Sequence, residues 1–240
     1  MRDARCLAIV PAFNEEASVG AVVREIRAFD PRFEVLVVDD ASDDQTAAVA
    51  AAAGARVVRL PFNLGIGGAV QTGYRHARDA GFDVAVQIDG DGQHDPRELP
   101  AVLAPVLRGD ADVAIGSRFV GEPRYAATGP RRLAMRVFAR VVSLVVGQPL
   151  TDTTSSFRAV GRRGIRLFAS DYPHGFLETV EATVSGARSG LRLVEVPVAV
   201  RQRAAGRSSL TTARSLFYTL KVLLAIFVGL FRPRVALEEL

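Results

Sequence analysis

The chain has few of the residues that build several common kinds of site. It contains one cysteine, Cys6, and one lysine, Lys221. A single cysteine excludes an internal disulfide and a zinc site made of cysteines, and it suits a reducing compartment. No G-x-S-x-G pattern occurs, which argues against a serine hydrolase of that type. The apolar run 6–10 is too short for a secretory signal, so we expect none.

Charge is distributed unevenly along the chain, although the net charge is only +4. The first 120 residues carry 12 basic and 18 acidic side chains, and the remaining 120 carry 18 and 8. An acidic half suits a divalent cation, whereas a basic half made almost entirely of arginine suits phosphate groups or an anionic membrane surface. We expect partners of those two kinds and no nucleic acid.

Short apolar runs alternate with helical patterns over the first 120 residues. Strands are predicted at 7–10, 35–38, 56–60, 84–88 and 113–116, and helices at 18–29, 68–80 and 95–108, with an alanine-rich helix that stops at Gly54. Asp43 or Asp44 is the expected N-cap of the alanine-rich helix, and Asp95 that of the last helix. This alternation predicts an α/β fold whose mostly parallel sheet has helices on both faces. Ligands of such sheets bind beyond the carboxyl ends of the strands.

The second half is less regular. Helices are predicted at 131–146 and 177–187, a strand at 191–200, and polar loops at 151–158 and 201–209. The segment 210–231 has apolar residues at helical spacing, but its apolar part measures about 24 Å as a helix, which is too short for a bilayer core of roughly 30 Å. We therefore expect a globular domain over residues 1–209 and, over 210–240, an amphipathic helix and tail. That helix would lie in the membrane plane, dock on a small membrane protein, or pack on the core.

The strongest local signal follows the predicted strand 84–88. Asp89 and Asp91 lie one residue apart in the sequence D-G-D-G-Q, 89–93. Two carboxylates at a buried strand end cannot comfortably both be charged without a cation. Carboxylate and amide oxygens are hard ligands that suit Mg²⁺ or Mn²⁺ bound together with substrate phosphates. We therefore predict a metal site at Asp89, Asp91 and Gln93; the alternative is an ordinary acidic turn.

Two further strands are expected to end at the same edge of the sheet. Asp39 and Asp40 follow the strand 35–38 and can accept hydrogen bonds from a nucleobase or a ribose, with helix capping as the alternative. Pro11, Phe13 and Glu15 follow the strand 7–10. Phe13 can lie against a flat base, and Glu15 can accept a hydrogen bond from a ribose hydroxyl.

The glycine-rich run N-L-G-I-G-G-A at 63–69 is not a dinucleotide-binding fingerprint. The sixth position of the G-x-G-x-x-G pattern is Val70, and the run follows the third predicted strand instead of the first. We expect a turn after which a helix packs tightly near the ligand.

Together these segments resemble the motifs of glycosyltransferase family 2 enzymes with the GT-A fold. The matches are P-x-x-N-E at 11–15, V-V-D-D-x-S-x-D-x-T at 37–46, N-x-G-x-G-x-A at 63–69 and D-x-D-x-Q at 89–93. Further matches are G-S-R at 116–118, D-x-x-S-x-F-R at 152–158, E-x8-G at 181–190, E-V-P at 195–197 and R-x-x-G-x-S at 203–208. This set is similar to the dolichyl-phosphate mannose synthase branch, which places a sugar on a polyprenyl phosphate. Two positions depart from the branch: Ser156 stands where it usually has Gly, and Ser209 where it often has Lys.

The resemblance implies a role for each matching residue. The nucleotide would be held by Pro11, Phe13, Glu15, Asp39, Asp40 and Asp89, and the metal by Asp89, Asp91 and Gln93. Phosphates would be held by Arg118, Arg131, Arg203 and Ser208, and the catalytic set would be Asp91, Arg118, Arg203, Asp152 and Glu181.

The implied reaction is a metal-dependent, inverting transfer of a sugar from GDP-mannose or a UDP-hexose to a polyprenyl or dolichyl phosphate. The protein would be peripheral, on the cytoplasmic face of the membrane. A phosphate acceptor is mostly ionised at neutral pH and needs no strong base, whereas a hydroxyl acceptor needs a carboxylate such as Asp152 or Glu181. Two alternatives stay open: transfer to a saccharide, protein or small-molecule hydroxyl, and a non-catalytic subunit that binds a nucleotide sugar.

Overall fold

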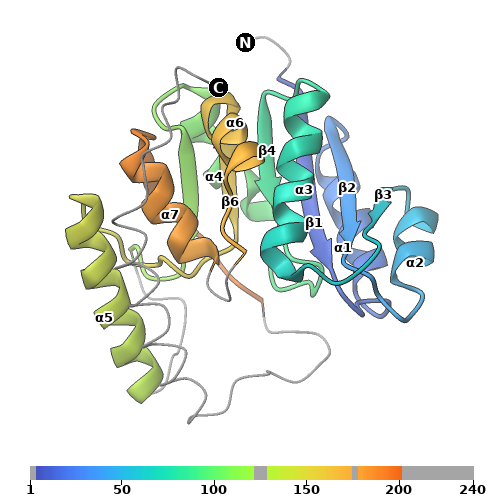
Figure 1. Cartoon of the computed structure of the whole chain (residues 1–240), viewed down its shortest axis with the longest axis horizontal. Helices are drawn as coiled ribbons and strands as arrows, with labels where there is room; N and C mark the ends of the chain where they lie inside the picture. Colours follow the sequence, from blue (N-terminus) through green and yellow to red (C-terminus); the bar gives the residue numbers. More distant parts are fainter. Residues whose placement is uncertain (1–3, 122–128, 175–177, 202–240) are drawn as a thin grey trace.

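The computed structural model describes residues 4–121, 129–174 and 178–201, and the side chains of 129–135 lie outside that description (Figure 1). The strands are β1 (Cys6–Ala12), β2 (Phe33–Asp39), β3 (Arg56–Arg59), β4 (Val84–Gln87), β5 (Val113–Ser117), β6 (Arg158–Gly161) and β7 (Leu193–Pro197). The helices are α1 (Val19–Phe29), α2 (Thr46–Ala52), α3 (Gly65–Asp79), the 3₁₀ turn η1 (Pro96–Glu98), α4 (Leu99–Leu107), α5 (Gly129–Val146), α6 (Arg162–Ser170) and α7 (Glu178–Arg188).

The strands form one sheet in the order β3-β2-β1-β4-β6-β5-β7. Every neighbouring pair is parallel except those that involve β6, which runs antiparallel to both β4 and β5. The expectation of a mostly parallel sheet is therefore confirmed. Strand β6 and helix α6 were not predicted, and the expected loop 151–158 ends one residue early because Arg158 already belongs to β6.

Helices cover both faces of the sheet, as predicted. Alternate residues of a strand point to opposite faces, so the apolar run of β1 is divided between two cores. Ala8 and Val10 pack with α1 and α4, whereas Leu7 and Ile9 pack with α3 and α6. Burial on both faces explains why these strands are apolar throughout instead of alternating with polar residues.

A smaller core lies beside the second of these faces, where α5 packs on α7. Phe138 and Val142 of α5 lie with Val180 and Val184 of α7, and Figure 1 shows the two helices side by side. Among the described helices, none is both long and apolar enough to cross a membrane. The expected helix at 210–231 and the domain boundary at 209 lie outside the described residues.

Two local expectations need correction. The residue at the N-cap of α2 is Gln45, although Asp44 does accept the backbone N–H of Thr46 at 2.9 Å. The expected strand 191–200 is shorter, because β7 spans only Leu193–Pro197. The cap at Asp95 is confirmed, since its carboxylate accepts the backbone N–H of Arg97 at the start of η1.

Candidate active site

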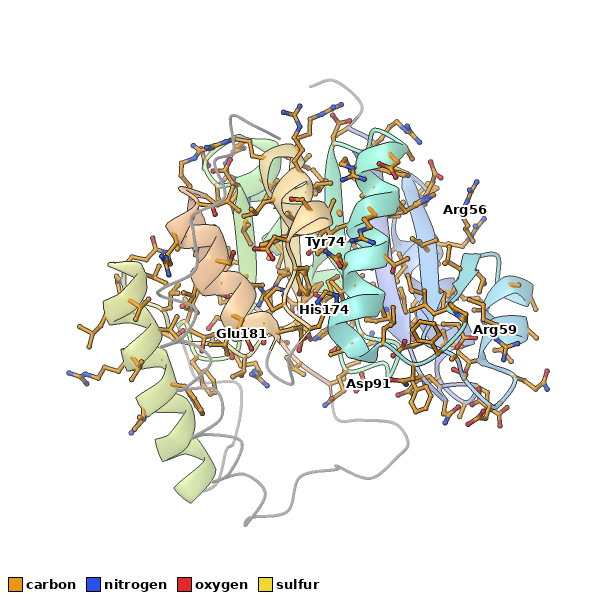
Figure 2. The ribbon with its side chains drawn as sticks, viewed as in Figure 1. Arg56, Arg59, Tyr74, Asp91, His174 and Glu181 are labelled. Atoms are coloured by element: carbon orange, nitrogen blue, oxygen red, sulfur yellow. The ribbon has the colours of Figure 1, made fainter. Side chains whose placement is uncertain are left out.

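The carboxyl ends of β1, β2 and β4 meet at a pocket of about 190 Å³. Its lining residues are Pro11, Ala12, Phe13, Glu15, Asp40, Ile66, Ala69, Asp89, Gly90 and Asp91. The first two strand ends, the start of α3 and the D-G-D segment thus contribute to one cavity. In Figure 2, Asp91 lies at the lower end of α3.

The two adjacent aspartates after β2 face different surroundings. Asp40 lines the pocket, and its Oδ1 accepts the backbone N–H of Leu64 at 2.7 Å. Asp39 is completely buried, and its Oδ1 accepts the backbone N–H of Ser42 at 3.0 Å. Its Oδ2 lies 3.3 Å from Nε of Arg59, an ion-pair distance without the geometry of a hydrogen bond. Of these two aspartates, Asp40 lines the pocket and Asp39 does not.

The loop after β1 brings an aromatic ring and a carboxylate to the same pocket. Phe13 lines the pocket and is 46% exposed, so its side chain is accessible to a ligand. The carboxylate of Glu15 accepts a hydrogen bond from the Ser18 hydroxyl at 2.7 Å. The backbone N–H of Glu15 donates to Oγ1 of Thr46 at 2.8 Å. These bonds tie the loop to α1 and α2 and hold it at the pocket edge.

Asp89 and Asp91 both line the pocket. Oδ2 of Asp89 accepts the Ser156 hydroxyl at 2.6 Å, while its Oδ1 is buried and has no hydrogen-bond partner among the described residues. Oδ1 of Asp91 accepts the backbone N–H of Gln93 at 3.0 Å. Gln93 is not among the residues that line the pocket. Its backbone N–H donates to Asp91, and its carbonyl oxygen accepts the backbone N–H of Arg201 at 2.8 Å.

These two carboxylates fit a divalent cation that takes its other ligands from phosphates and water. Within the described residues no group of three or more histidine, cysteine, aspartate or glutamate side chains gathers around one point. Mg²⁺ and similar ions are commonly held by one or two carboxylates plus substrate phosphates, so a pair suffices. The buried Oδ1 of Asp89, which lacks a donor, is the kind of oxygen that such an ion satisfies.

The start of α3 closes the pocket from one side, and close packing holds it there. A Cβ atom on Gly67 would lie 2.2 Å from the carbonyl oxygen of Pro173, and one on Gly73 would lie 2.3 Å from Cγ2 of Ile9. The expected tight packing of this helix is thus confirmed, and its place beside the ligand stays a prediction. Because Ile66 and Ala69 line the pocket, the positive end of the α3 dipole lies beside it, which favours anions.

Arg118 and Asp152, two of the predicted catalytic residues, pair with each other. Nε and one terminal nitrogen of Arg118 donate to the two oxygens of Asp152 at 2.6 and 2.7 Å, and its backbone N–H donates at 3.0 Å. The Asp152 side chain is fully buried and that of Arg118 is 17% exposed. Glu195 in turn accepts the backbone N–H of Asp152 at 2.6 Å. Asp152 therefore holds the guanidinium of Arg118 in place.

Neither this pair nor the remaining predicted residues are among the residues that line the pocket, and some of them lie outside the described part of the chain. Glu181 is half-buried on α7, and Figure 2 shows it on that helix, away from Asp91. The side chain of Arg131 and all of Arg203 and Ser208 lie outside the described residues. The described chain ends at Arg201, whose guanidinium joins Glu25 at 2.5 Å and Asp95 at 2.9 Å. It therefore ends beside the segment that follows Asp91.

The sequence did not predict a buried polar cluster near Asp89, which consists of Arg158, Glu178 and Tyr172. Arg158 is completely buried, and its guanidinium donates to the carbonyl oxygens of Ser155 at 2.6 Å and Thr179 at 3.3 Å. The pKa of Glu178 is raised to about 7, mainly by burial; the nearby Asp89 contributes to the rise and Arg158 opposes it. Burial also raises the pKa of Tyr172. Arg158 stood in a matched motif, but Glu178 gave no signal, because only the packing of α7 buries it.

Comparison with known proteins identifies the class to which this fold and site belong. The family model described as glycosyl transferase family 2 matches residues 7–168. The chain therefore belongs to glycosyltransferase family 2, has the GT-A fold and is a glycosyltransferase.

Two curated relatives and one solved structure show which members of the family this chain is similar to. An undecaprenyl-phosphate mannosyltransferase of Micrococcus luteus is 34% identical over 215 residues, which cover 86% of this chain and 88% of that protein. A polyprenol monophosphomannose synthase of Mycolicibacterium smegmatis is 32% identical over 217 residues, which cover 86% and 81%. The glucosyl-3-phosphoglycerate synthase of Mycobacterium tuberculosis, solved with Mn²⁺, UDP-glucose and phosphoglyceric acid, superposes with a TM-score of 0.71 at 21% identity over 96% of this chain and 81% of that one. This last likeness is one of fold.

Proposed function

We propose that this chain transfers a sugar from GDP-mannose or a UDP-hexose to a polyprenyl phosphate, with inversion at the anomeric carbon. The observation that carries the proposal is the pocket in which Phe13, Glu15 and Asp40 lie together with Asp89 and Asp91. A nucleotide sugar needs both kinds of group, one for its base and ribose and one for its diphosphate. The two relatives named for polyprenyl-type acceptors support the choice of acceptor.

The donor would be held along the pocket by three kinds of contact. Phe13 would pack against the base, and the carboxylates of Glu15 and Asp40 would accept hydrogen bonds from the base or the ribose hydroxyls. Asp89 and Asp91 would hold Mg²⁺ or Mn²⁺, with Gln93 nearby. The ion supplies charge neutralisation on the leaving diphosphate as a Lewis acid. The N-terminus of α3 adds a favourable field for the same phosphates.

The arrangement of Arg118 and Asp152 favours a phosphate acceptor over a hydroxyl. Both oxygens of Asp152 accept hydrogen bonds from Arg118, so the carboxylate is engaged in holding a cation and is poorly placed to remove a proton. A phosphate that is already ionised needs positioning by cations rather than a base, and Arg118 would supply it together with Arg131, Arg203 and Ser208.

A lipid acceptor would place the reaction at a membrane surface. We propose that the protein is peripheral, on the cytoplasmic face, and that residues 1–209 form the catalytic domain. The segment 210–240 would carry an amphipathic helix that lies on an anionic bilayer or docks on a small membrane protein.

The test is transfer of radiolabel from a panel of nucleotide sugars into organic-extractable lipid, with a polyprenyl phosphate and Mg²⁺ or Mn²⁺. We expect metal-dependent label in the lipid phase from one donor. Asp91→Asn should lower transfer by at least about 100-fold, because it removes a charged group that stabilises the leaving diphosphate, while circular dichroism stays unchanged. Asp110→Asn, at an exposed aspartate paired with Arg108, is the matched control and should keep full activity.

Two results would contradict this proposal. Label that enters only water-soluble acceptors would move the assignment to a hydroxyl acceptor. Full activity of Asp91→Asn would remove the metal role of that carboxylate.

A further inference from the structure

Within the described residues, Ser156 makes the one side-chain hydrogen bond to the Asp89 carboxylate, at Oδ2, and Nε2 of His94 lies 3.9 Å from the same oxygen. Oγ of Ser156 lies 2.6 Å from Oδ2 of Asp89, a short bond of the kind that a charged acceptor forms. The other oxygen, Oδ1, is buried, lacks a hydrogen-bond partner among the described residues, and belongs to a side chain that lines the pocket. The two oxygens of one carboxylate therefore have different surroundings.

Buried contacts on the C-terminal side hold the segment that carries Ser156. Arg158 donates to the carbonyl oxygen of Ser155 at 2.6 Å and to that of Thr179 in α7 at 3.3 Å. Arg158 is completely buried, and its Nε has no hydrogen-bond partner among the described residues. Moving this segment would leave further donors of a buried cation unmet, which is costly. The residue before Ser156 is thus fixed to α7 through Arg158.

Contacts on the pocket side hold the same segment against the loop of Asp89. The ring of Phe157, the residue after Ser156, stacks on His94 with centroids 4.9 Å apart and planes at 18°. Nδ1 of His94 accepts the backbone N–H of Asp89 at 3.1 Å. The backbone and the side chain of Asp89 are therefore both anchored to the segment 156–157.

We propose that Ser156 is a positioning residue that orients the Asp89 carboxylate, so that Oδ1 faces a divalent cation bound with the nucleotide. The inference rests on the proposed metal-dependent function. Groups that hydrogen-bond to a metal ligand fix its orientation and so reduce the cost of ordering it when the ion binds. A glycine at position 156, which the resembling branch usually has, would offer no hydroxyl for this bond.

The test measures Mn²⁺ binding by the full-length chain instead of its turnover. Free Mn²⁺ is followed by its electron paramagnetic resonance signal in a titration with GDP, and separately with UDP. We expect Ser156→Ala and Ser156→Gly to weaken Mn²⁺ binding by about 10-fold, the lower end of the range for such contacts. Ser156→Thr keeps the hydroxyl and should bind within about threefold of the wild type.

A matched control removes a hydroxyl elsewhere. Ser170 donates to the carbonyl oxygen of Leu167 at the end of α6, and Ser170→Ala should leave Mn²⁺ binding unchanged. Thermal unfolding in EDTA reports whether each variant folds; if Ser156→Ala does not, the comparison of Ser156→Thr with Ser156→Gly decides.

The outcomes separate this inference from the proposed function. Wild-type Mn²⁺ binding with unchanged binding in Ser156→Ala or Ser156→Gly would overturn the positioning role and leave the proposed function standing. A wild-type chain that binds no Mn²⁺ with either nucleotide would overturn both this role and the metal dependence. Loss in Ser156→Ala without retention in Ser156→Thr would show a packing effect and would also overturn the role.

Discussion

Glu178 shows how strongly its surroundings can change a single residue. The side chain is buried at the start of α7, and burial raises its pKa from 4.5 to about 7. Asp89 and Glu181 raise the pKa as well, and Arg158 lowers it. The folded state therefore holds a proton that the unfolded chain releases between these two pH values.

This gives a definite sign to the pH dependence of stability. The contribution from protonated Glu178 is fully present below pH 4.5 and is lost as the pH rises to about 7. At about 1.4 kcal/mol per pKa unit, the change is roughly 3 kcal/mol. Glutamine does not titrate, so the Glu178→Gln variant does not lose this contribution as the pH rises. Its free energy of unfolding, relative to that of the wild type, should therefore increase by up to about 3 kcal/mol between pH 4.5 and pH 8. Urea denaturation in EDTA at several pH values measures it.

The control for this prediction is Glu34→Gln, at an exposed glutamate paired with Arg5. Its stability curve should run nearly parallel to that of the wild type. Parallel curves for Glu178→Gln and the wild type would show that folding does not change the pKa of Glu178, and would contradict the prediction.

Helix α3 is the element on which the pocket most depends. It packs against β1 through Gly73 and against the Pro173 backbone through Gly67, and its first turn lines the pocket. In an exposed helix, replacing Gly by Ala stabilises by about 1 kcal/mol. Here the absent Cβ leaves the space that lets α3 approach the sheet, so packing outweighs helix propensity.

Gly73→Ala should therefore destabilise the protein, by about 1–3 kcal/mol as overpacking does, because its Cβ would lie 2.3 Å from Cγ2 of Ile9. Gly186→Ala in α7 is the matched control. Its Cβ would lie 3.3 Å from the end of the Leu191 side chain and 3.6 Å from the ring of Phe168. Neither contact is as close as the one at Gly73, so the effect should be small or stabilising. Chemical denaturation of both variants measures the difference, and a more stable Gly73→Ala would contradict the packing argument.

At the scale of the whole molecule, the two halves of the chain have opposite charge balance. The acidic half contributes the carboxylates of the pocket, and the basic half includes the segments proposed to meet phosphates and the membrane. All seven strands of the described sheet lie between Cys6 and Pro197. The segment after 209 adds none of these strands.

Ending the chain after Ser209 should therefore leave the α/β domain folded while weakening its attachment to lipid. We expect the full chain to cosediment with vesicles that contain anionic lipid, and the shortened chain to lose most of this binding. Near-ultraviolet circular dichroism of both chains checks the fold. Equal binding of the two chains would place the lipid contact within residues 1–209, and no binding by either would favour docking on a membrane protein.

Local patterns in the sequence were enough to predict the architecture and the family. Runs of apolar residues with periods of strand and helix, separated by turn residues, predict the α/β alternation because these signals act within a few residues. The carboxylates after the strand 84–88 predict a ligand site for the same reason, since parallel strand ends meet at one edge. Strand β6 was not predicted because its sequence, R-A-V-G, contains no run of large apolar residues.

The α/β class, the family and the carboxyl edge of the sheet as the place of the pocket therefore follow from the amino-acid sequence. Three features required the folded structure: which of Asp39 and Asp40 lines the pocket, the pairing of Asp152 with Arg118, and the contact of Ser156 with Asp89. The last two contacts join residues 34 and 67 positions apart. Such contacts depend on how separate elements pack against one another, and no pattern of neighbouring residues specifies them.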